Sequence, residues 1–468
     1  MFNFKIEKNN DMNNINLCLI LSILLTFNFK SSVYPQEVSE KYLNAWSDVE
    51  IEDRIHTGIE THRKGWAEIS FISFEGKPVE FTGEIIIKQE SHDFLFGASI
   101  FMLDGYKEES KNDAYELVFK ELLNFATVPF YWKTLEPEKG KPRFEKDSKF
   151  IYRRPPPDRV VEFCKKNDVV MKGHPVFWDH PGFAIPEWWP QNADSTELLL
   201  EDRVKELAKR YSNDILFWDA VNEANNRKTW IPAPENFPLY TFQLCNQYFK
   251  STNSFAYNFT THIWRDSRGK YSHEYVLTEN LLLKGGKPDA IGLQLHLMGK
   301  KLWNEVLNGQ EMTPDKLYKV LDLYADFNLP LQITEITFPA LPEGDIGEEN
   351  QARVTKDFYR LLFSHPNVEA ITWWNVSDGG AAKNQNRWLG GFLREDLSRK
   401  PSCNVLHELI NHEWKTKLNV DLKSEHNYKF KGFYGHYDII LKEDGKIIGK
   451  EHVELKKSKD NQFLIEIR

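Results

Sequence analysis

Eight short apolar segments recur between residues 94 and 378, on average about 39 residues apart. Stretches with helical periodicity lie between several of them, for example Pro157–Lys166, Leu198–Arg210, Pro314–Phe327 and Asn350–Ser364. Short strands alternating with helices are typical of the α/β class, and eight units predict a closed (β/α)8 barrel, or TIM barrel, with chemistry at the carboxyl ends of its strands. The expected strands are Phe94–Phe101, Phe125–Trp132, Val169–Trp178, Ile215–Ala224, Glu274–Asn280, Ala290–Leu297, Leu331–Phe338 and Ala370–Asp378.

The segments on either side of this predicted barrel alternate apolar and polar residues, as half-buried strands do. Trp66 to Gln89 does so around a Glu-Gly-Lys-Pro turn, which predicts a β hairpin, and the tail from Leu418 has turn signals of its own. Neither segment can bury a core alone, so we expect them to pack together as a small accessory β element. The expected units are an N-terminal segment at 33–92, the barrel at 93–415 and a C-terminal β element at 416–468.

An apolar run from Ile15 to Phe29 has the length of a signal-peptide core and is short for a membrane span. We therefore expect residues 1–32 to be a secretory signal and the mature protein to be secreted or periplasmic. Only Ser31 and Ser32 offer small residues near the expected cut, so a lipid or a retained surface anchor is the alternative. One of the four cysteines, Cys18, lies within this expected signal. The other three, Cys164, Cys245 and Cys403, are odd in number and widely scattered, so we expect no disulfide framework.

The charge balance limits the classes of partner. The 468 residues include 60 Lys and Arg against 69 Asp and Glu, a formal charge of −9. This acidity argues against nucleic acid or an anionic membrane as the main partner and favours a neutral or weakly charged substrate. Aromatic residues make up 14% of the chain and can stack on sugar rings as well as fill a core. The sequence has no glycine-rich phosphate loop and no metal-ligand spacing, so we expect neither a cofactor nor a metal.

Several of the expected strands end in polar or ionisable side chains. Any one of these, taken alone, is more often a structural hydrogen-bond partner. Glu223 and Glu335, however, end the fourth and seventh strands and so face each other across a barrel. Glycoside hydrolysis requires such a pair, with one carboxyl group protonated to donate to the leaving oxygen and the other ionised. The pattern therefore predicts a glycosidase.

Five strings surround these positions: GHPVFW at 173–178, WDAVNEA at 218–224, IGLQLH at 291–296, ITE at 333–335 and ITWW at 371–374. A further segment, GGFLRED at 390–396, is followed by Lys400-Pro401. Together they resemble, in order, the motifs of glycoside hydrolase family 10, the endo-β-1,4-xylanases, over roughly residues 90–412. The resemblance implies a retaining endo-β-1,4-xylanase that hydrolyses internal bonds of xylan by double displacement. The implied partner is a polysaccharide, and we expect a monomer.

The resemblance also implies a role for each matching residue. Glu223 would be the general acid/base and Glu335 the nucleophile. Asn222 would hydrogen-bond the 2-hydroxyl of the sugar at the cleavage point, and His296 would hydrogen-bond the nucleophile. The remaining matching positions would bind substrate at the sugar site: His174, Trp132, Gln294, Trp374 and Trp388. Successive strand residues point to opposite faces, so only one of the pair at 373 and 374 should face the barrel mouth.

Two stretches depart from the family pattern. The family's second strand carries an acidic-Asn-acidic-Met-Lys-Trp string whose polar members hold the sugar on the non-reducing side. Here residues 127–132 read Thr-Val-Pro-Phe-Tyr-Trp, and Asp179 stands where the family often has a second histidine. Losing two or three such hydrogen bonds can shift specificity, so a decorated xylan, another β-glycan or a bias toward transglycosylation stays open.

Other polar residues near the expected site carry weaker expectations. Lys133 and Glu136 are close enough in sequence to replace the lost polar groups. The arginines at 153 and 154 precede three prolines and could pair with carboxylates or line a groove; we expect pairing. Glu279, near the end of the expected fifth strand, is a third carboxylate. We expect its side chain to be solvated. A non-catalytic carbohydrate-binding barrel is the remaining alternative, although a pure binder would have no need for both glutamates.

Overall fold

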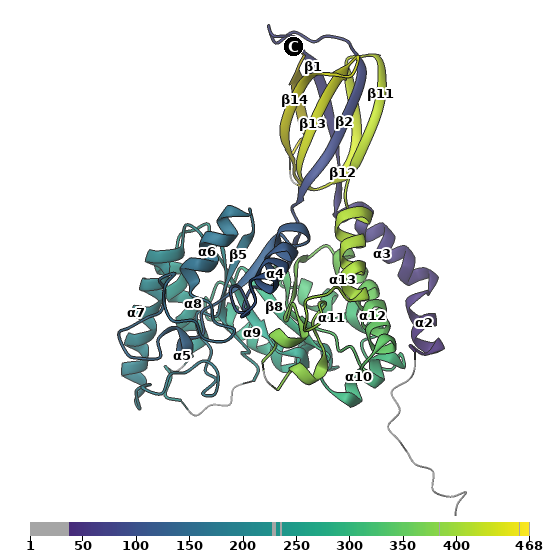
Figure 1. Ribbon diagram of the computed structural model, residues 1–468. Helices are drawn as coiled ribbons and strands as arrows, with labels where there is room; N and C mark the ends of the chain where they lie inside the picture. The colour runs from purple at the N-terminus through teal and green to yellow at the C-terminus, as the bar shows by residue number, and fades with distance from the viewer. Residues whose placement is uncertain (1–36, 227–230, 235, 383, 458, 468) are drawn as a thin grey trace, which may run out of the picture.

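The computed structural model describes residues 37–226, 231–234, 236–382, 384–457 and 459–467, so the expected signal at 1–32 lies outside the described residues. Figure 1 shows a helix-covered barrel with a narrow β domain standing on one end of it. Helices Glu40–Trp46 (α2) and Val49–His62 (α3) run beside the barrel helix Asp345–Ser364 (α12). In the part of the chain that is described, no helix is long and apolar enough to cross a membrane.

Eight parallel strands close into a barrel, which confirms the expected fold class. The order around the barrel is β10-β3-β4-β5-β6-β7-β8-β9, and β10 closes the ring by pairing with β3. Most strand residues are apolar and buried, as expected for strands covered on both faces. The strands are Leu95–Ser99 (β3), Phe125–Pro129 (β4), Val170–His174 (β5), Phe217–Val221 (β6), Ser254–Phe259 (β7), Ala290–His296 (β8), Leu331–Thr337 (β9) and Val368–Trp373 (β10).

The expected fifth strand at Glu274–Asn280 is wrong. That segment lies within the helix His273–Leu283 (α9), and the fifth barrel strand is β7, inside the long stretch 227–271 that held no predicted strand. The buried residues of α9 are Glu274, Tyr275, Thr278 and Leu281, a spacing of three or four that belongs to a helix. Ser272 caps this helix by accepting a hydrogen bond from the backbone N–H of Tyr275.

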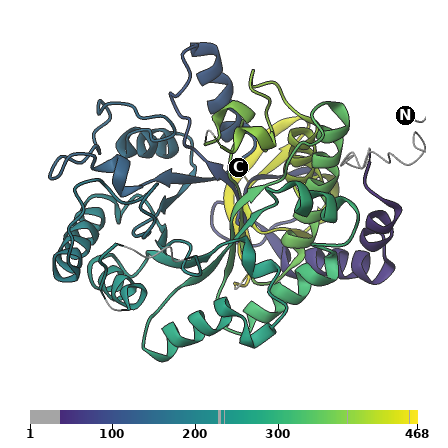
Figure 2. The same ribbon diagram turned by 90° about the horizontal axis from the view of Figure 1, so that it is seen from below.

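The helices form an outer ring around the strands, as Figure 2 shows from below. The predicted helix Pro157–Lys166 coincides with α6, and the other three predicted helices overlap α7, α11 and α12. Besides α9 and α12, the helices of this ring are Glu109–Glu121 (α4), Trp132–Leu135 (α5), Pro157–Lys166 (α6), Ala193–Tyr211 (α7), Phe237–Tyr248 (α8), Lys300–Leu307 (α10), Pro314–Ala325 (α11) and Pro401–Glu408 (α13).

The accessory β element is confirmed, but its N-terminal part is not a hairpin. Lys64–Ile72 (β1) lies between Asn427–Phe433 (β12) and Gln462–Glu466 (β15) in one sheet. Phe81–His92 (β2) lies in a second sheet, of order β11-β2-β13-β14, whose other strands are Lys417–Glu425 (β11), Gly435–Glu443 (β13) and Lys446–Leu455 (β14). The alternating pattern placed the strands correctly, yet it could not specify their partners. Apolar side chains of both sheets fill one shared core, so β1 and β2 face each other across the core.

The β domain lies at the amino-terminal end of the barrel strands, because β2 ends at His92 and the chain enters β3 at Leu95. Arg63 fastens this junction by donating hydrogen bonds to the backbone carbonyls of Phe363, His365 and Val368. A cavity of about 900 Å³ also lies here, lined by residues of the barrel and of the β domain. The carboxyl ends of the barrel strands are thus left open at the opposite end of the molecule (Figure 1).

Candidate active site

Two strands bring the two glutamates to the open end of the barrel. Glu335 lies within β9 and is 4% exposed. Glu223 follows β6 by two residues and has a left-handed backbone conformation, with φ of 48°. For a residue with a Cβ this conformation is uncommon, and such residues are enriched at active sites.

Gln294, on β8, joins the two carboxyl groups. Its Nε2 lies 3.0 Å from Oε1 of Glu335 and 3.5 Å from Oε1 of Glu223. These two oxygens are therefore separated by no more than the two distances combined. Retaining glycosidases hold their carboxyl groups about 5–5.5 Å apart, and inverting ones about 6.5–9.5 Å apart. The upper limit reaches only the lower edge of the inverting range.

The carboxylate of Glu335 is held from several sides. Nε2 of His296 lies 2.9 Å from its Oε2, while Nδ1 of His296 lies 2.9 Å from the hydroxyl of Thr337. Nε2 of His174 lies 3.9 Å from the other oxygen. With Gln294, these contacts fix the orientation of the group that would attack a sugar.

Glu223 has a different environment. Asn226 donates a hydrogen bond from Nδ2 to Oε2 of Glu223 at 2.8 Å. Burial raises the pKa of Glu223, the nearby Glu335 raises it further, and the bond from Asn226 works in the opposite direction. The net effect is a raised pKa, which suits a carboxyl group that must carry a proton to the leaving oxygen.

Asn222 is fixed through its oxygen. Its Oδ1 accepts a hydrogen bond from Nδ2 of Asn258 at 2.8 Å, and Oδ1 of Asn258 in turn accepts one from the hydroxyl of Thr334 at 2.9 Å. All three side chains are buried. The amide nitrogen of Asn222 is therefore the end of this side chain that can donate to a substrate.

A buried ionic network supports His174. Asp219 accepts a hydrogen bond from Nδ1 of His174 at 2.7 Å and forms an ion pair with Nζ of Lys172 at 2.6 Å. Burial acts to raise the pKa of Asp219, but Lys172 and His174 together outweigh it, so the pKa is lowered. The other nitrogen of His174 lies 3.1 Å from the hydroxyl of Tyr131. In the string at 127–132, Tyr131 stands where the family has lysine, and its hydroxyl places a polar atom beside His174.

Of the two adjacent tryptophans at 373 and 374, only one faces the barrel mouth. The ring of Trp374 lies 5.5 Å from that of His174 and 6.1 Å from that of His296, so Trp374 faces the barrel mouth. Trp373 points the other way and donates from Nε1 to the carbonyl of Gly390. The half-buried Trp388 lies at the same end of the barrel, where its carbonyl accepts a hydrogen bond from the N–H of Ala340.

The structure does not bring Trp132 to the carboxyl pair. Its ring packs edge-on against Trp189 at 5.0 Å, and its Nε1 donates to Glu136. The guanidinium of Arg203 covers it at 4.6 Å. The backbone turns from β4 into α5 at this residue, so the side chain at 132 enters the helical shell while its neighbour at 131 faces the site.

The other polar residues singled out by the sequence do not join the site. Lys133 pairs with the exposed Glu187, and Glu136 bonds Trp132 and the backbone of Gly140. Glu279 is exposed on α9. The expected pairing of Arg153 and Arg154 with carboxylates is wrong for the described residues, because both guanidinium groups pack on aromatic rings around Tyr131 instead.

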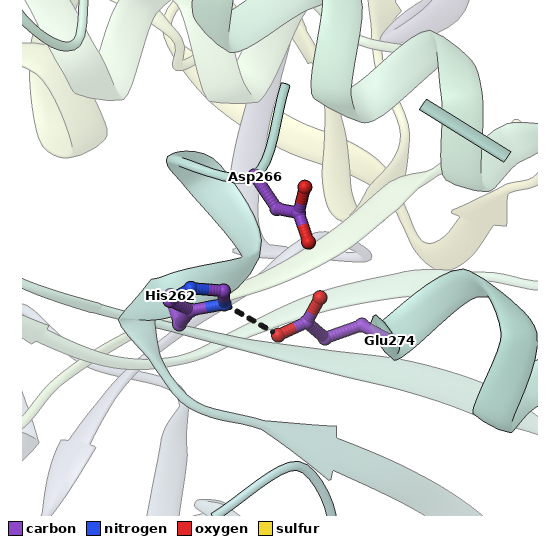
Figure 3. Close-up of side chains that lie close together, drawn as sticks. All are labelled: His262, Asp266 and Glu274. Carbon is purple, nitrogen blue, oxygen red and sulfur yellow. Dashed lines mark hydrogen bonds and ion pairs between the residues drawn. The ribbon is translucent and has the colours of Figure 1, made fainter. Parts of the chain in front are cut away.

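Among the described residues, one group of side chains has the composition of a metal site: His262, Asp266 and Glu274, with ligand atoms within 4.8 Å of one another. These groups already have protein partners. Nδ1 of His262 lies 2.9 Å from Oε1 of Glu274, as Figure 3 shows, and Arg268 bonds Asp266 and holds its pKa well below the usual range. Oε1 of Glu274 also accepts a hydrogen bond from Asn225 at 2.6 Å. The cluster thus braces Asn225, two residues beyond Glu223.

A closed (β/α)8 barrel with two carboxyl groups facing each other at the carboxyl ends of its strands defines a glycoside hydrolase. The model of glycosyl hydrolase family 10 matches residues 106–397. The chain therefore belongs to glycosyl hydrolase family 10, which confirms the resemblance found in the sequence.

Three proteins illustrate what the chain is similar to. Endo-1,4-beta-xylanase B of Thermotoga neapolitana is 24% identical over 310 residues, which cover 61% of this chain and 80% of that protein. Anti-sigma-I factor RsgI6 of Acetivibrio thermocellus is 24% identical over 84% of this chain, but the match spans only 47% of the relative's length. Xylanase 10B from Thermotoga petrophila RKU-1 in complex with xylobiose shares the fold, with a TM-score of 0.55 at 20% identity over 69% of this chain and 95% of that one.

Sequence reasoning missed Asn226, Asn258 and the brace at Glu274. Asn226 lies three residues beyond the motif that identified Glu223, and only the left-handed turn at Glu223 brings its amide back to the carboxyl group. No local pattern marks Asn258, because it lies on the strand that the sequence did not reveal.

Proposed function

We propose that this protein is a retaining endo-β-1,4-xylanase. The observation that carries the proposal is the contact of one amide nitrogen, Nε2 of Gln294, with both carboxyl groups. This contact limits their separation to a range in which one carboxylate can attack the sugar directly. Relatives named as endo-1,4-beta-xylanases support xylan as the substrate.

In the first step, Glu223 donates its proton to the oxygen of the scissile bond while Glu335 attacks the anomeric carbon. The bond to the leaving sugar breaks, and a covalent glycosyl-enzyme forms on Glu335. In the second step, Glu223, now ionised, takes a proton from water, and the water oxygen displaces Glu335. Asn222 donates to the 2-hydroxyl of the sugar as positive charge develops on the ring. The product keeps its original anomeric configuration.

The stereochemistry and the nucleophile can be tested together. Proton NMR of soluble xylan with wild-type enzyme should show the β-anomer appearing before mutarotation. Replacing the nucleophile, Glu335→Gln, should lower kcat by about 10⁴-fold or more, because the covalent step then lacks its attacking group. Initial formation of the α-anomer would contradict the retaining mechanism, and an unchanged rate in this variant would contradict the role of Glu335.

A different β-glycan is the second candidate, and the altered string at 127–132 is the observation that favours it. A panel of linear xylan, β-1,4-glucan, mixed-linkage glucan and mannan separates the candidates by kcat/KM. We expect xylan to lead. A chain that binds these glycans and releases reducing sugar from none of them would instead be a carbohydrate-binding barrel.

We further propose that the mature protein is secreted or periplasmic and monomeric. The apolar run at 15–29 supports export, with a surface anchor as the alternative. Fractionation of the producing cells and amino-terminal sequencing of the mature protein test the export. Light scattering of the purified enzyme tests the monomer.

A further inference from the structure

Two neighbouring guanidinium groups lie beside the site, and neither forms an ion pair with a carboxylate of the described residues. Arg153 and Arg154 belong to the loop that leads from α5 to α6, and Arg153 has a left-handed backbone conformation, with φ of 62°. The guanidinium of Arg154 lies 3.7 Å from the ring centroid of Tyr131. That of Arg153 lies 5.2 Å from the ring of Phe101 and 6.0 Å from that of Trp374. Aromatic rings at the barrel mouth therefore hold both cations in place.

The hydrogen bonds of these arginines are few. Nη1 of Arg153 donates to Oδ1 of Asn375 and to the carbonyl of Gly380, and Nη1 of Arg154 donates to the carbonyl of Arg153. Nε of Arg154 is buried and has no partner. Among the described residues, no hydrogen bond of its Nη2 and no ion pair of either arginine occurs. The Nε–Nη2 edge of Arg154 is the edge that can hold both oxygens of a carboxylate.

Another buried arginine shows what a purely structural role looks like. Arg203 is 6% exposed, and its guanidinium donates to three backbone carbonyls, those of Val176, Phe130 and Pro175. Its donors hold the loops after β4 and β5 together. Arg154 has no comparable set of acceptors, although burial lowers its pKa to about 10. A buried cation with few acceptors is costly, so Arg154 calls for a partner that the described residues do not supply.

The position of the two arginines indicates where that partner would lie. The hydroxyl of Tyr131, on which Arg154 stacks, lies 3.1 Å from Nε2 of His174, and this nitrogen lies 3.9 Å from Glu335. The arginines thus lie one side chain further from the reacting carboxyl groups than His174. Arg154 stacks on Tyr131, two residues beyond β4, the strand where polar groups of the family's glycone site are replaced.

We propose that Arg154, with Arg153 beside it, binds the carboxylate of a uronic acid branch on β-1,4-xylan. This inference rests on the proposed xylanase function and names the decoration that the glycone side accepts. A guanidinium group matches a carboxylate with two parallel hydrogen bonds, and stacking on Tyr131 orients it before the substrate arrives. The chain as a whole carries a formal charge of −9, so two adjacent cations at the barrel mouth are a local exception that favours an anionic group there.

The substrate itself offers a test that needs no variant. Three xylooligosaccharides of equal length are compared: unbranched, with one uronic acid branch, and with the same branch as its neutral methyl ester. We expect wild-type kcat/KM for the acid to exceed that for the ester by about ten- to a hundredfold, because a charge-assisted hydrogen bond is lost with the ester. The preference should shrink as NaCl is added.

The variant Arg154→Gln should bring the ratio of acid to ester close to one, and Arg154→Lys should restore part of it. Arg159→Gln is the matched control, because that arginine lies in the adjacent helix and pairs with Asp104; its ratio should equal that of wild type. Thermal unfolding checks that each variant is folded. Calorimetric titration of the Glu335→Gln enzyme with acid and ester measures the same preference without turnover.

The outcomes separate this inference from the proposed function. Cleavage of the unbranched oligosaccharide with equal rates on acid and ester overturns the carboxylate site and leaves the xylanase standing. An equal loss on all three substrates in Arg154→Gln also overturns it, since Arg154 would then only support Tyr131. Failure to cleave or bind any of the three overturns both.

Discussion

At the scale of single residues, the pKa of Glu223 depends on the side-chain amide of Asn226. Burial raises the pKa of Glu223 and the bond from Asn226 lowers it, so Asn226→Ala should raise it further. In the proposed mechanism, the enzyme is active while Glu223 is protonated and loses activity as the pH rises through the pKa of Glu223. The basic limb of kcat/KM should therefore move to higher pH in the variant.

The pH profile of soluble-xylan hydrolysis measures this shift. Asn411→Ala is a suitable control, because Asn411 is half-buried and donates a hydrogen bond to the backbone carbonyl of Glu121, outside the site. A basic limb that stays in place, or moves to lower pH, would contradict the role assigned to Asn226.

The buried pair of Lys172 and Asp219 supports a second prediction. Both side chains are 1% exposed, so Lys172→Met leaves the buried carboxylate of Asp219 without its lysine partner and should cost about 3–5 kcal/mol of unfolding free energy. Lys165→Met removes a surface pair with Asp214, in which the lysine side chain is 58% exposed and the aspartate side chain 28%. Its loss should cost about 1 kcal/mol or less. Urea unfolding at pH 7 compares the two. Equal losses would show that burial does not decide the strength of these pairs.

Because the pKa of Asp219 is lowered, the stabilisation from this ion pair should decrease as the pH falls. A carboxyl group with a lowered folded-state pKa stabilises the protein above its unfolded value, about 3.9, and the contribution disappears as pH falls through the folded value. The gap between wild type and Lys172→Met should therefore narrow in acid. A gap that widens as the pH falls would be inconsistent with the ion pair.

At the scale of elements, Arg63 joins the β domain to the barrel. Its guanidinium satisfies three carbonyls between the end of α12 and the start of β10, and Arg63→Met would leave all three without this donor. We expect a loss of about 3 kcal/mol or more in unfolding free energy. Arg54→Met is the control, because Arg54 makes an exposed pair with Asp322. Similar melting temperatures for the two variants would refute the role of Arg63.

Elements also show where sequence reasoning reaches its limit. The helix at Pro157–Lys166 was predictable to the residue, because it starts with proline and has a strong apolar stripe. The strand Ser254–Phe259 was not, because five of its six residues are buried, so it shows no alternation of apolar and polar positions. Its neighbour α9 contains enough β-branched and aromatic residues to resemble a strand, although its burial follows a helical period.

At the scale of the whole molecule, the two ends of the chain depend on each other. Deleting residues 419–468 removes both neighbours of β1 and both neighbours of β2, and with them one side of the shared core. Limited proteolysis should then cut within residues 66–89, which the intact domain protects. Activity on soluble xylan should persist, because the site lies at the far end of the barrel. Unchanged digestion of this segment would contradict the packing.

The sequence by itself determined the eight-unit barrel, the family and the two glutamates, because periodicity and short motifs are written in neighbouring residues. It did not reveal that β1 and β2 lie in different sheets, that Trp132 turns into the helical shell, or that Arg154 stacks on Tyr131. Those features depend on which distant segments meet, and only the closed tertiary structure decides that. The two glutamates proposed to be catalytic could therefore be predicted from the sequence, while the surroundings that would select a substrate could not.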